Sequence, residues 1–302
     1  MPEWNDRERA ALVALLKTRP DGLTWPEVAA EVADTRSAQA IWDKHQSPDL
    51  FTENTSTDAL TEALDDVHRW QQADFRFLTF MDREYPQQLL EVHQFPPVLF
   101  TQGVLRQHEL GVSVVGSRSA SEFGIRNAGE LARLLAKVDI TVISGLAAGI
   151  DTTAHTSALE SGRRTVAVIG TGINQYYPSS NASLQKAIAR DGLVISQFWP
   201  DSPPSKSSFP LRNATMSAYG RATIVVEAGE QSGARIQARL AVAHGRPVVL
   251  MDAVVRGTNW GAKLRGQPGV LVANSPQEAV EHIEKIVYDD GQVSDLLAKV
   301  PS

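Results

Sequence analysis

The sequence predicts an α/β fold: a doubly wound, mostly parallel sheet preceded by a small helical domain. From residue 111 onward, short β-branched runs alternate with amphipathic segments, a pattern typical of a parallel sheet covered by helices on both faces. The chain has 302 residues, 42% of them hydrophobic and 21% charged, so it can form one large domain and a smaller one. We expect a helical domain over 1–72, the α/β domain over 73–288 and a tail over 289–302.

The helical domain is predicted from apolar residues at helical spacing from Asp6 to Leu16. A second helix is expected to begin at Thr24, a good N-cap residue, with Pro26 in its first turn. The polar stretch 54–58 is expected to be a loop that caps a last helix ending near Trp70.

A transition leads into the larger domain. The aromatic run 75–80 predicts a strand. A short helix is expected at Tyr85-Pro86, and an extended segment is expected over Pro96–Phe100. Residues 288–302 are expected to form a frayed or loosely packed tail.

The strands and helices of the α/β domain follow in order. The expected strands are Val112–Gly116, Thr141–Ser144, Thr165–Gly170, Leu193–Ser196, Ala222–Glu227, Pro247–Met251 and Val270–Val272. The amphipathic segments between them include Ala128–Lys137, Thr152–Ser161, Leu184–Arg190 and Ala234–His244. In such a fold, ligands bind at the carboxyl ends of the strands.

Composition excludes several kinds of site. The chain has no cysteine, so disulfides, zinc-thiolate sites and thiol nucleophiles are excluded. No apolar run approaches the ~20 residues of a membrane span, and the N-terminus lacks the pattern of a signal peptide, so we expect a cytoplasmic protein without a membrane partner.

The net charge of −6 is unevenly distributed. Residues 1–75 carry fifteen acids and seven bases, whereas 203–270 carry nine bases and three acids. The second segment therefore favours an anionic ligand, provided that the fold brings its cations to one face.

Glycine-rich turns follow three of the expected strands: Gly116-Ser117-Arg118, the run from Ser144 to Asp151, and Gly170-Thr-Gly172. Such turns bind phosphate through backbone N–H groups. Neither a dinucleotide fingerprint nor a Walker A loop is present. A tight turn with an exposed Arg118 explains the first motif equally well.

Asp151 and His155 are four residues apart on one expected helix. This spacing could orient an imidazole for catalysis, but neither a nucleophile nor a set of metal ligands accompanies the pair. We therefore expect a helix-capping Asp151 and a packed His155, with no catalytic residue, metal or cofactor.

The segment 209–213, Phe-Pro-Leu-Arg-Asn, places a ring, a guanidinium and an amide in what is expected to be one short loop. Lys206 precedes it, and Ser232-Gly233 opens a further helix. Cations for phosphates and a ring for a base suit a nucleotide or a nucleic-acid strand. The tyrosines at 176 and 177 are expected to pack within their own domain.

Several motifs in fixed order resemble the DNA processing protein A family (DprA, also called Smf) over roughly residues 75–270. They are Gly116-Ser-Arg118 with Ser121 and Phe123-Gly124, Ser144-Gly-Leu-Ala-x-Gly-Ile-Asp151 with Ala154-His155, Gly170-x-Gly172 with Tyr177-Pro-x-x-Asn181, Phe209-Pro-x-Arg-Asn213, Val225-Val-Glu-Ala228 and Ser232-Gly233. The lead-in, Tyr85-Pro, Pro96-Pro-Val-Leu-Phe100 and Gly103, matches as well.

The resemblance implies an extended Rossmann-like domain that binds single-stranded DNA and loads the recombinase RecA onto it during natural transformation. It also implies a homodimer without enzymatic activity. The residues expected to grip the strand are Arg118, Lys206, Phe209, Arg212 and Asn213. Those expected to frame the pocket are Gly116, Ser117, Gly145, Gly170 and Ser232. The N-terminal domain corresponds by position only to a sterile-alpha-motif-like domain.

The chain departs from the family pattern at several points. Ala214 and Gln197 stand where the family has Arg and Glu, the approach 257–263 to the last strand is shortened, and no winged-helix domain is expected after residue 290.

Two other functions stay open. The loss of the second Arg favours a sensor of a nucleotide-derived small molecule. A phosphoribohydrolase is least favoured, because Glu227–Gly233 lacks the Pro-Gly-Gly-x-Gly-Thr loop of such enzymes. The oligomeric state, the RecA contact surface and the role of the N-terminal domain are left undetermined by the sequence.

Overall fold

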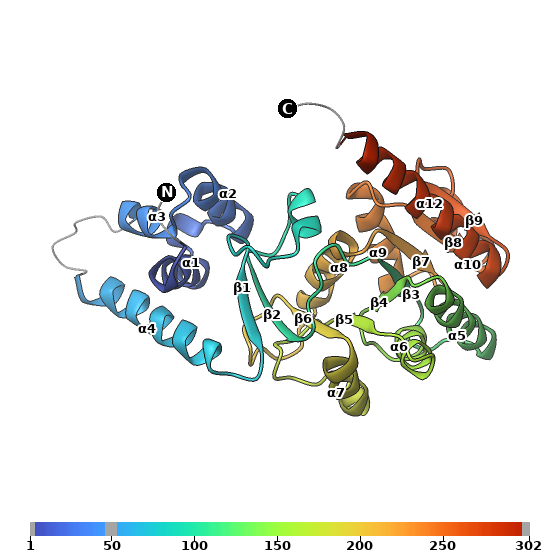
Figure 1. Cartoon of the computed structure of the whole chain (residues 1–302), viewed down its shortest axis with the longest axis horizontal. Coiled ribbons are helices and arrows are strands. Elements are labelled where there is room, and N and C mark those ends of the chain that lie inside the picture. Colours follow the sequence, from blue (N-terminus) through green and yellow to red (C-terminus); the bar gives the residue numbers. More distant parts are fainter. Residues whose placement is uncertain (1–3, 46–52, 298–302) are drawn as a thin grey trace.

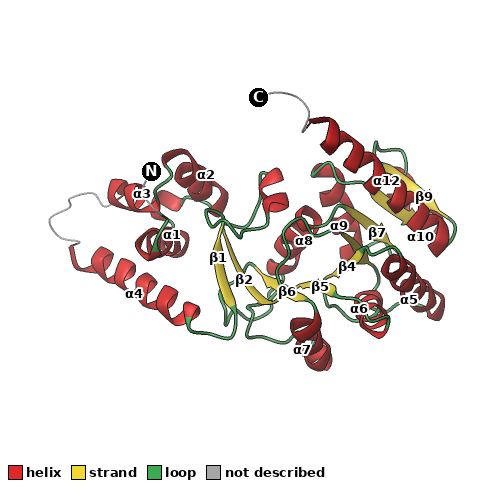
Figure 2. Ribbon diagram, viewed as in Figure 1, coloured by secondary structure: helices red, strands yellow, loops and turns green. Residues whose placement is uncertain are grey.

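The computed structural model of the chain describes residues 4–45 and 53–297 (Figure 1). Within these residues, a nine-stranded sheet has helices on both faces, and a group of helices lies beside its first strand (Figures 1 and 2). The seven strands β3 to β9 pair parallel with one another, which confirms the predicted α/β fold.

The strands follow the spatial order β1-β2-β6-β5-β4-β3-β7-β8-β9. Their bounds are β1 Arg76–Thr79, β2 Val98–Gly103, β3 Gly111–Val115, β4 Thr141–Ser144, β5 Thr165–Val168, β6 Leu193–Ser196, β7 Ala222–Val225, β8 Val248–Met251 and β9 Val270–Ala273. The first two strands form an antiparallel hairpin whose second strand also pairs antiparallel with β6.

Helices cover the two faces of this sheet. The helices are α5 Glu122–Lys137, α6 Ile150–Glu160, α7 Ala182–Asp191, α8 Ser208–Tyr219, α9 Gly233–Ala243, α10 Asp252–Gly257, α11 Asn259–Leu264 and α12 Pro276–Leu297. On one face α5 contacts α6 and α12, and α6 contacts α7; α8 packs beside α9 on the other. The buried strands between them, such as β3 and β4, form the core.

The strand order reverses direction beside β3. The chain runs from β3 through β4, β5 and β6 toward one edge, and then returns through α8 to place β7 on the other side of β3. At such a switch point the loops leaving the two central strands diverge and open a crevice at their carboxyl ends. The fold therefore positions a ligand site beyond residues 115 and 225.

The N-terminal helices are α1 Asp6–Thr18, α2 Trp25–Thr35, α3 Ala38–His45 and α4 Glu53–Gln71. Thr24 caps α2 in a reciprocal capping box with Glu27, and Pro26 lies in the first turn, as predicted. The loop predicted at 54–58 is wrong, because α4 already includes these residues. Polar residues tolerate an exposed helical surface as readily as a loop, so composition alone does not separate the two.

Other expectations need smaller corrections. The segment expected to be merely extended near Pro96–Phe100 contributes the strand β2, which the edge strand β1 pairs with. Residues 288–297, expected to belong to a frayed or loosely packed tail, are the last part of α12, which continues to Leu297; the last five residues lie outside the described part. The short helices α10 and α11 were not predicted.

Candidate functional site

Two cavities open at the carboxyl edge of the sheet, beside the switch point between β3 and β7. Their volumes are about 560 Å³ and 130 Å³, and Arg118, Phe209 and Arg212 line both. The sequence-predicted residues that line one or both are Gly116, Ser117, Arg118, Gly145, Gly170, Phe209, Arg212, Asn213 and Ser232. The prediction that the glycine turns lie on one side of the sheet, near Phe209, is confirmed.

Lys206 is the one predicted site residue that lines neither cavity. It is exposed in the turn before α8, three residues ahead of Phe209. Its assignment to the site stays a prediction.

Phe209 and Arg212 lie in the first two turns of α8, so the loop predicted for 209–213 is wrong. Pro210 is compatible with this helix because the N–H groups of a first turn have no partner within the helix. The helical conformation also explains the site's geometry. Residues three apart share one face of a helix, and both side chains thereby reach the cavities.

Arg118 and Phe209 form the exposed part of the site. The Arg118 guanidinium lies 5.1 Å from the centre of the Phe209 ring, and the Tyr177 ring lies 5.6 Å from Phe209 on another side. Arg118 is exposed and Phe209 is half-buried. A cation beside two aromatic rings at a cavity mouth offers a phosphate contact and a stacking surface at the same place.

Arg212 is in a different environment, because it is only 5% exposed. Its guanidinium donates hydrogen bonds to the carbonyl oxygens of Gly145 and, at 2.9 Å, of Val168. Its Nε donates to the Asn213 side chain at 3.0 Å. Arg212 therefore ties together the ends of β4 and β5. Burial lowers its pKa, and the nearby Asp151 carboxylate opposes that shift.

His155 is packed in the interior, as expected from the sequence, but Asp151 does not cap helix α6 as expected. The Asp151 carboxylate accepts from the amides of Gly145 and Ala147 at 3.1 and 3.3 Å, so it caps the turn after β4; Gly149 is the N-cap of α6 itself. Burial raises the pKa of Asp151, and Arg212 counteracts this. His155 is fully buried, and its Nδ1 lies 2.7 Å from the Thr165 hydroxyl.

The glycines at 145 and 170 leave room for neighbouring side chains. A Cβ at Gly145 would lie 1.8 Å from the Arg212 guanidinium, and one at Gly170 would lie 2.7 Å from the Phe209 ring. Both distances are far below van der Waals contact. These two positions therefore require glycine for the packing of Arg212 and Phe209.

The turns after β3 and β7 are joined by Glu227. Its backbone carbonyl accepts from the Ser117 amide at 2.7 Å, and its carboxylate accepts from the Ser121 amide at 2.9 Å. Across the cavity, Ser232 caps α9 by accepting from the amide of Ala234, and Asn213 donates to the carbonyl of Gly233 at 3.4 Å. Hydrogen bonds between the turns that follow β3 and β7 thus fix the positions of the walls of the crevice.

Sequence reasoning missed two contributors to the site. Tyr177 contacts Phe209 of its own domain, as expected, but it also lines the smaller cavity, which was not expected. Asp151 lines the larger one and lies near the buried Arg212. The signal for Tyr177 was its glycine-turn motif. Nothing in the sequence pairs Asp151 with Arg212, which is 61 positions away.

The cations of segment 203–270 do not share one face. Arg246 pairs with Glu91 at 2.5 Å, and Arg256 pairs with Asp252. Arg235, Arg239 and Lys263 line a third cavity of about 430 Å³ between α9 and α11, which shares no residue with the other two. The charge asymmetry of the sequence therefore overstates the number of cations at the candidate site. 

Within the described residues, no cluster of His, Asp or Glu is arranged to hold a metal ion. None of the described helices combines the length and apolar composition needed to cross a membrane.

The Smf protein of Synechocystis is 34% identical over 236 residues, which cover 76% of this chain and 56% of that protein. The X-ray structure of DNA processing protein A from Streptococcus pneumoniae matches with a TM-score of 0.70 and 28% identity, over 91% of this chain and 95% of that one.

A structure of DNA processing protein A from Helicobacter pylori, which describes its binding mode for single-stranded DNA, matches with a TM-score of 0.62 and 25% identity. That match covers 70% of this chain and 97% of the other. This chain thus spans little more than half of the Synechocystis protein but nearly all of the two solved structures.

The sequence model of one family, the DNA recombination-mediator protein A, matches residues 76–287, which is well over half of the chain and includes both cavities at the carboxyl edge. The order of strands, the glycine turns and α8 all lie within this match. The chain belongs to the DNA recombination-mediator protein A family.

Proposed function

We propose that this chain binds single-stranded DNA at the carboxyl edge of its sheet, without sequence preference. The observation that carries the proposal is the contact of Arg118 with the Phe209 ring at the mouth of a cavity of about 560 Å³. A guanidinium for a phosphate and a ring for a base face are the two contacts that strand binders combine. Neither reads a base edge, so binding is expected to tolerate any sequence.

The two arginines would act differently in such a complex. Arg118 is exposed and can pair directly with a phosphate. Arg212 is engaged with the carbonyl oxygens of Gly145 and Val168, so its main contribution would be positive charge beneath the cavity and a rigid floor. Binding would thus rest on fewer direct phosphate contacts than the number of basic residues suggests.

The relatives support this proposal. The Helicobacter pylori protein, whose structure concerns binding of single-stranded DNA, shares the fold over 70% of this chain. By the same family relationship, we propose a non-enzymatic role in recombination, RecA as a protein partner, a homodimer and a cytoplasmic location. We also propose 1–72 and 73–288 as the two domains.

The decisive experiment is a binding titration with labelled single- and double-stranded oligonucleotides of increasing length. A strand binder gains affinity with length until its site is filled. Its affinity also falls with salt, with a log–log slope of roughly −0.7 for each phosphate contacted. A flat salt response and no gain with length would contradict the proposal.

The Arg118→Ala variant tests the phosphate contact. We expect weaker binding and a salt slope reduced by about 0.7, the contribution of one phosphate. The matched control is Arg190→Ala, since Arg190 is exposed at the end of α7, just before β6 begins and therefore at the opposite edge of the sheet. An Arg118 variant that binds like the wild type would remove this residue from the site.

The partner proposals have separate tests. Light scattering coupled to gel filtration measures the mass of the particle, and a single-chain mass at micromolar concentration would refute the homodimer. For RecA, the rate at which it coats a strand already covered by single-strand-binding protein should rise when this chain is added. An unchanged rate would argue against the loading role.

A sensor of a nucleotide-derived small molecule is the second candidate. The larger cavity, at about 560 Å³, falls in the range of small-ligand pockets, ~300–1,000 Å³. Calorimetry with mononucleotides separates the two functions. A mononucleotide that binds as tightly as a long oligonucleotide favours the sensor.

A further inference from the structure

The N-terminal helices contact the loop that follows β6 through a cluster of tryptophans. The Trp199 ring lies 5.4 Å from that of Trp25, edge to face, and 5.6 Å from that of Trp70, stacked. The Lys17 ammonium lies 5.7 Å from the Trp199 ring. Trp25 begins α2 and Trp70 lies near the end of α4, so Trp199 is held by two different helices of the N-terminal group.

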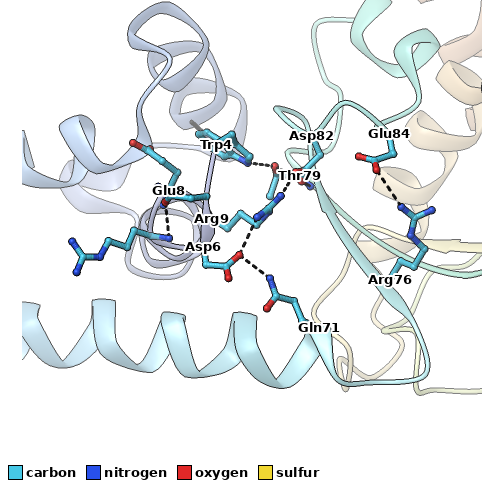
Figure 3. A network of polar contacts seen from close by, with 11 residues as sticks. Trp4, Asp6, Glu8, Arg9, Gln71, Arg76, Thr79, Asp82 and Glu84 are labelled. Atoms are coloured by element: carbon cyan, nitrogen blue, oxygen red, sulfur yellow. Dashed lines mark hydrogen bonds and ion pairs between the residues drawn. The ribbon is translucent and has the colours of Figure 1, made fainter. Parts of the chain in front are cut away.

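This helical group is itself attached to the edge of the sheet. The Trp4 indole donates to the Thr79 hydroxyl at 2.8 Å, and Arg9 pairs with Asp82 at 2.5 Å (Figure 3). The Trp70 ring also packs 5.0 Å from that of Phe100 on β2. The tryptophans around Trp199 are therefore anchored on β1 and β2, and they can hold the loop at a fixed place relative to the sheet.

The backbone next to Trp199 is bonded to the glycine turn after β5. The Gly172 amide donates to the Ser202 carbonyl at 2.8 Å, and the Asn174 amide donates to the Pro200 carbonyl at 2.9 Å. The approach is close, since a Cβ at Gly172 would lie 2.2 Å from the carbonyl oxygens of Trp199 and Pro200. Movement of Trp199 would therefore displace this turn.

Both segments continue into the candidate site. The turn leads to Tyr177, whose ring contacts Phe209. The loop leads through Lys206 to Ser208, whose hydroxyl donates to the Gly170 carbonyl at 2.6 Å. The two chain segments that form the aromatic wall of the site thus meet beside Trp199.

We propose that Trp199 is a positioning residue through which the N-terminal helices fix the aromatic wall of the DNA site, formed by Tyr177 and Phe209. The proposal rests on single-stranded DNA being the ligand of that site. This role of the N-terminal helices needs no contact between them and DNA. The helices pack against the Trp199 indole and so position its loop, and that loop is hydrogen-bonded to the turn that leads to Tyr177.

The experiment compares full-length variants in two measurements. Trp199→Ala and Trp25→Ala should each weaken binding of a single-stranded oligonucleotide by about tenfold, which corresponds to ~1.4 kcal/mol. Both should also speed hydrogen exchange at the amides of Gly172 and Asn174 in the absence of DNA. Trp199→Phe, which keeps a ring between Trp25 and Trp70, should restore most of the affinity and the slow exchange.

The matched control is Trp4→Phe. It removes the hydrogen bond to Thr79 at the same boundary but leaves the contacts of Trp199 in place. This variant should lower the melting temperature without changing DNA affinity or the exchange of the two amides. Equal loss of affinity in Trp4→Phe and Trp199→Ala would mean that general destabilisation explains the effect, and would overturn the proposal.

The remaining outcomes separate this inference from the proposed function. Unchanged exchange, or faster exchange with unchanged affinity, in Trp199→Ala overturns the positioning role while DNA binding by the wild type stands. A wild type that does not bind single-stranded DNA overturns the proposed function and this role together.

Discussion

Two arginines of the site differ because one is exposed and the other is buried. Arg118 lies over the Phe209 ring, where a bound phosphate can reach it, whereas the donors of Arg212 are used by the carbonyls at the ends of β4 and β5. A residue type therefore does not define a role at this site. The role of each arginine depends on how many of its N–H donors already form hydrogen bonds within the protein.

The first prediction at this scale concerns Phe209. Replacement by Ala should cost roughly 1–3 kcal/mol in binding of single-stranded DNA, as loss of a stacked base does, with little change in the salt slope. Because the ring also packs beside Gly170, melting temperature must be measured on the same variant. The control is Tyr288→Ala, an aromatic residue that is 65% exposed on α12. A marked loss of stability with unchanged affinity would show that Phe209 is a packing residue.

Gly145 provides the second prediction. Gly145→Ala would bring a methyl group to 1.8 Å from the Arg212 guanidinium, so the arginine has to move and its two carbonyl bonds weaken. Overpacking of this kind typically costs about 1–3 kcal/mol of unfolding free energy, measurable by denaturant titration. An added Cβ at Gly257 has no atom within 4 Å, so Gly257→Ala is the control and should leave the unfolding free energy almost unchanged. Equal effects would mean that the space around Gly145 is not limiting.

Among the elements, α8 connects the sheet to the site. Its first turns carry Phe209 and Arg212, and its start is tied to the end of β5 by the hydrogen bond from Ser208 to the Gly170 carbonyl. The helix thereby fixes the distance between the aromatic wall and the buried arginine. The departure from the family at Ala214 falls within the same helix, at a buried position.

The prediction for this element is that Ser208→Ala loosens the start of α8. The variant loses the buried hydrogen bond to Gly170 and two contacts of the same hydroxyl with the Ser205 backbone. Loss of the buried bond alone should cost ~0.5–1.5 kcal/mol of unfolding free energy, with an accompanying loss of DNA affinity. Ser207→Ala removes the neighbouring hydroxyl, which is exposed and hydrogen-bonds the Ser205 hydroxyl, and this variant should change neither quantity. Identical stabilities and affinities for the two variants would contradict the role given to Ser208.

At the scale of the whole molecule, some buried polar groups contribute both to the stability of the fold and to the geometry of the site. Burial, with a contribution from Arg212, lowers the pKa of His155 to about 3. The pKa of an unfolded histidine is ~6.5, so between these values the unfolded chain binds a proton that the folded chain does not. The contribution of neutral His155 to the free energy of unfolding is therefore fully present above the pKa of the unfolded histidine, and it is lost as the pH falls below that value.

We accordingly predict that the free energy of unfolding falls by up to ~1.4 kcal/mol per pH unit, through His155, as the pH is lowered from about 6.5 toward 5. Denaturant titrations at several pH values give the slope. In His155→Asn, which has no titrating ring but can still bond Thr165, this slope should be smaller. Asp151 is present in both proteins, so the difference between the two isolates His155. Parallel slopes would rule out a buried neutral imidazole.

The sequence by itself determined the fold class and the glycine turns at the strand ends, and nine of the ten site residues that it predicts line the two cavities. The reason is that strand–turn–helix order and fixed motif spacing are local properties of a chain. The sequence did not reveal that 209–213 is helical, since Pro210 in a first turn looks the same as a proline in a loop. It also could not reveal that Arg212 is buried against Gly145, or that Trp199 lies between Trp25 and Trp70. These contacts join residues 67, 174 and 129 positions apart, and only the packing of the sheet with its helices brings them together.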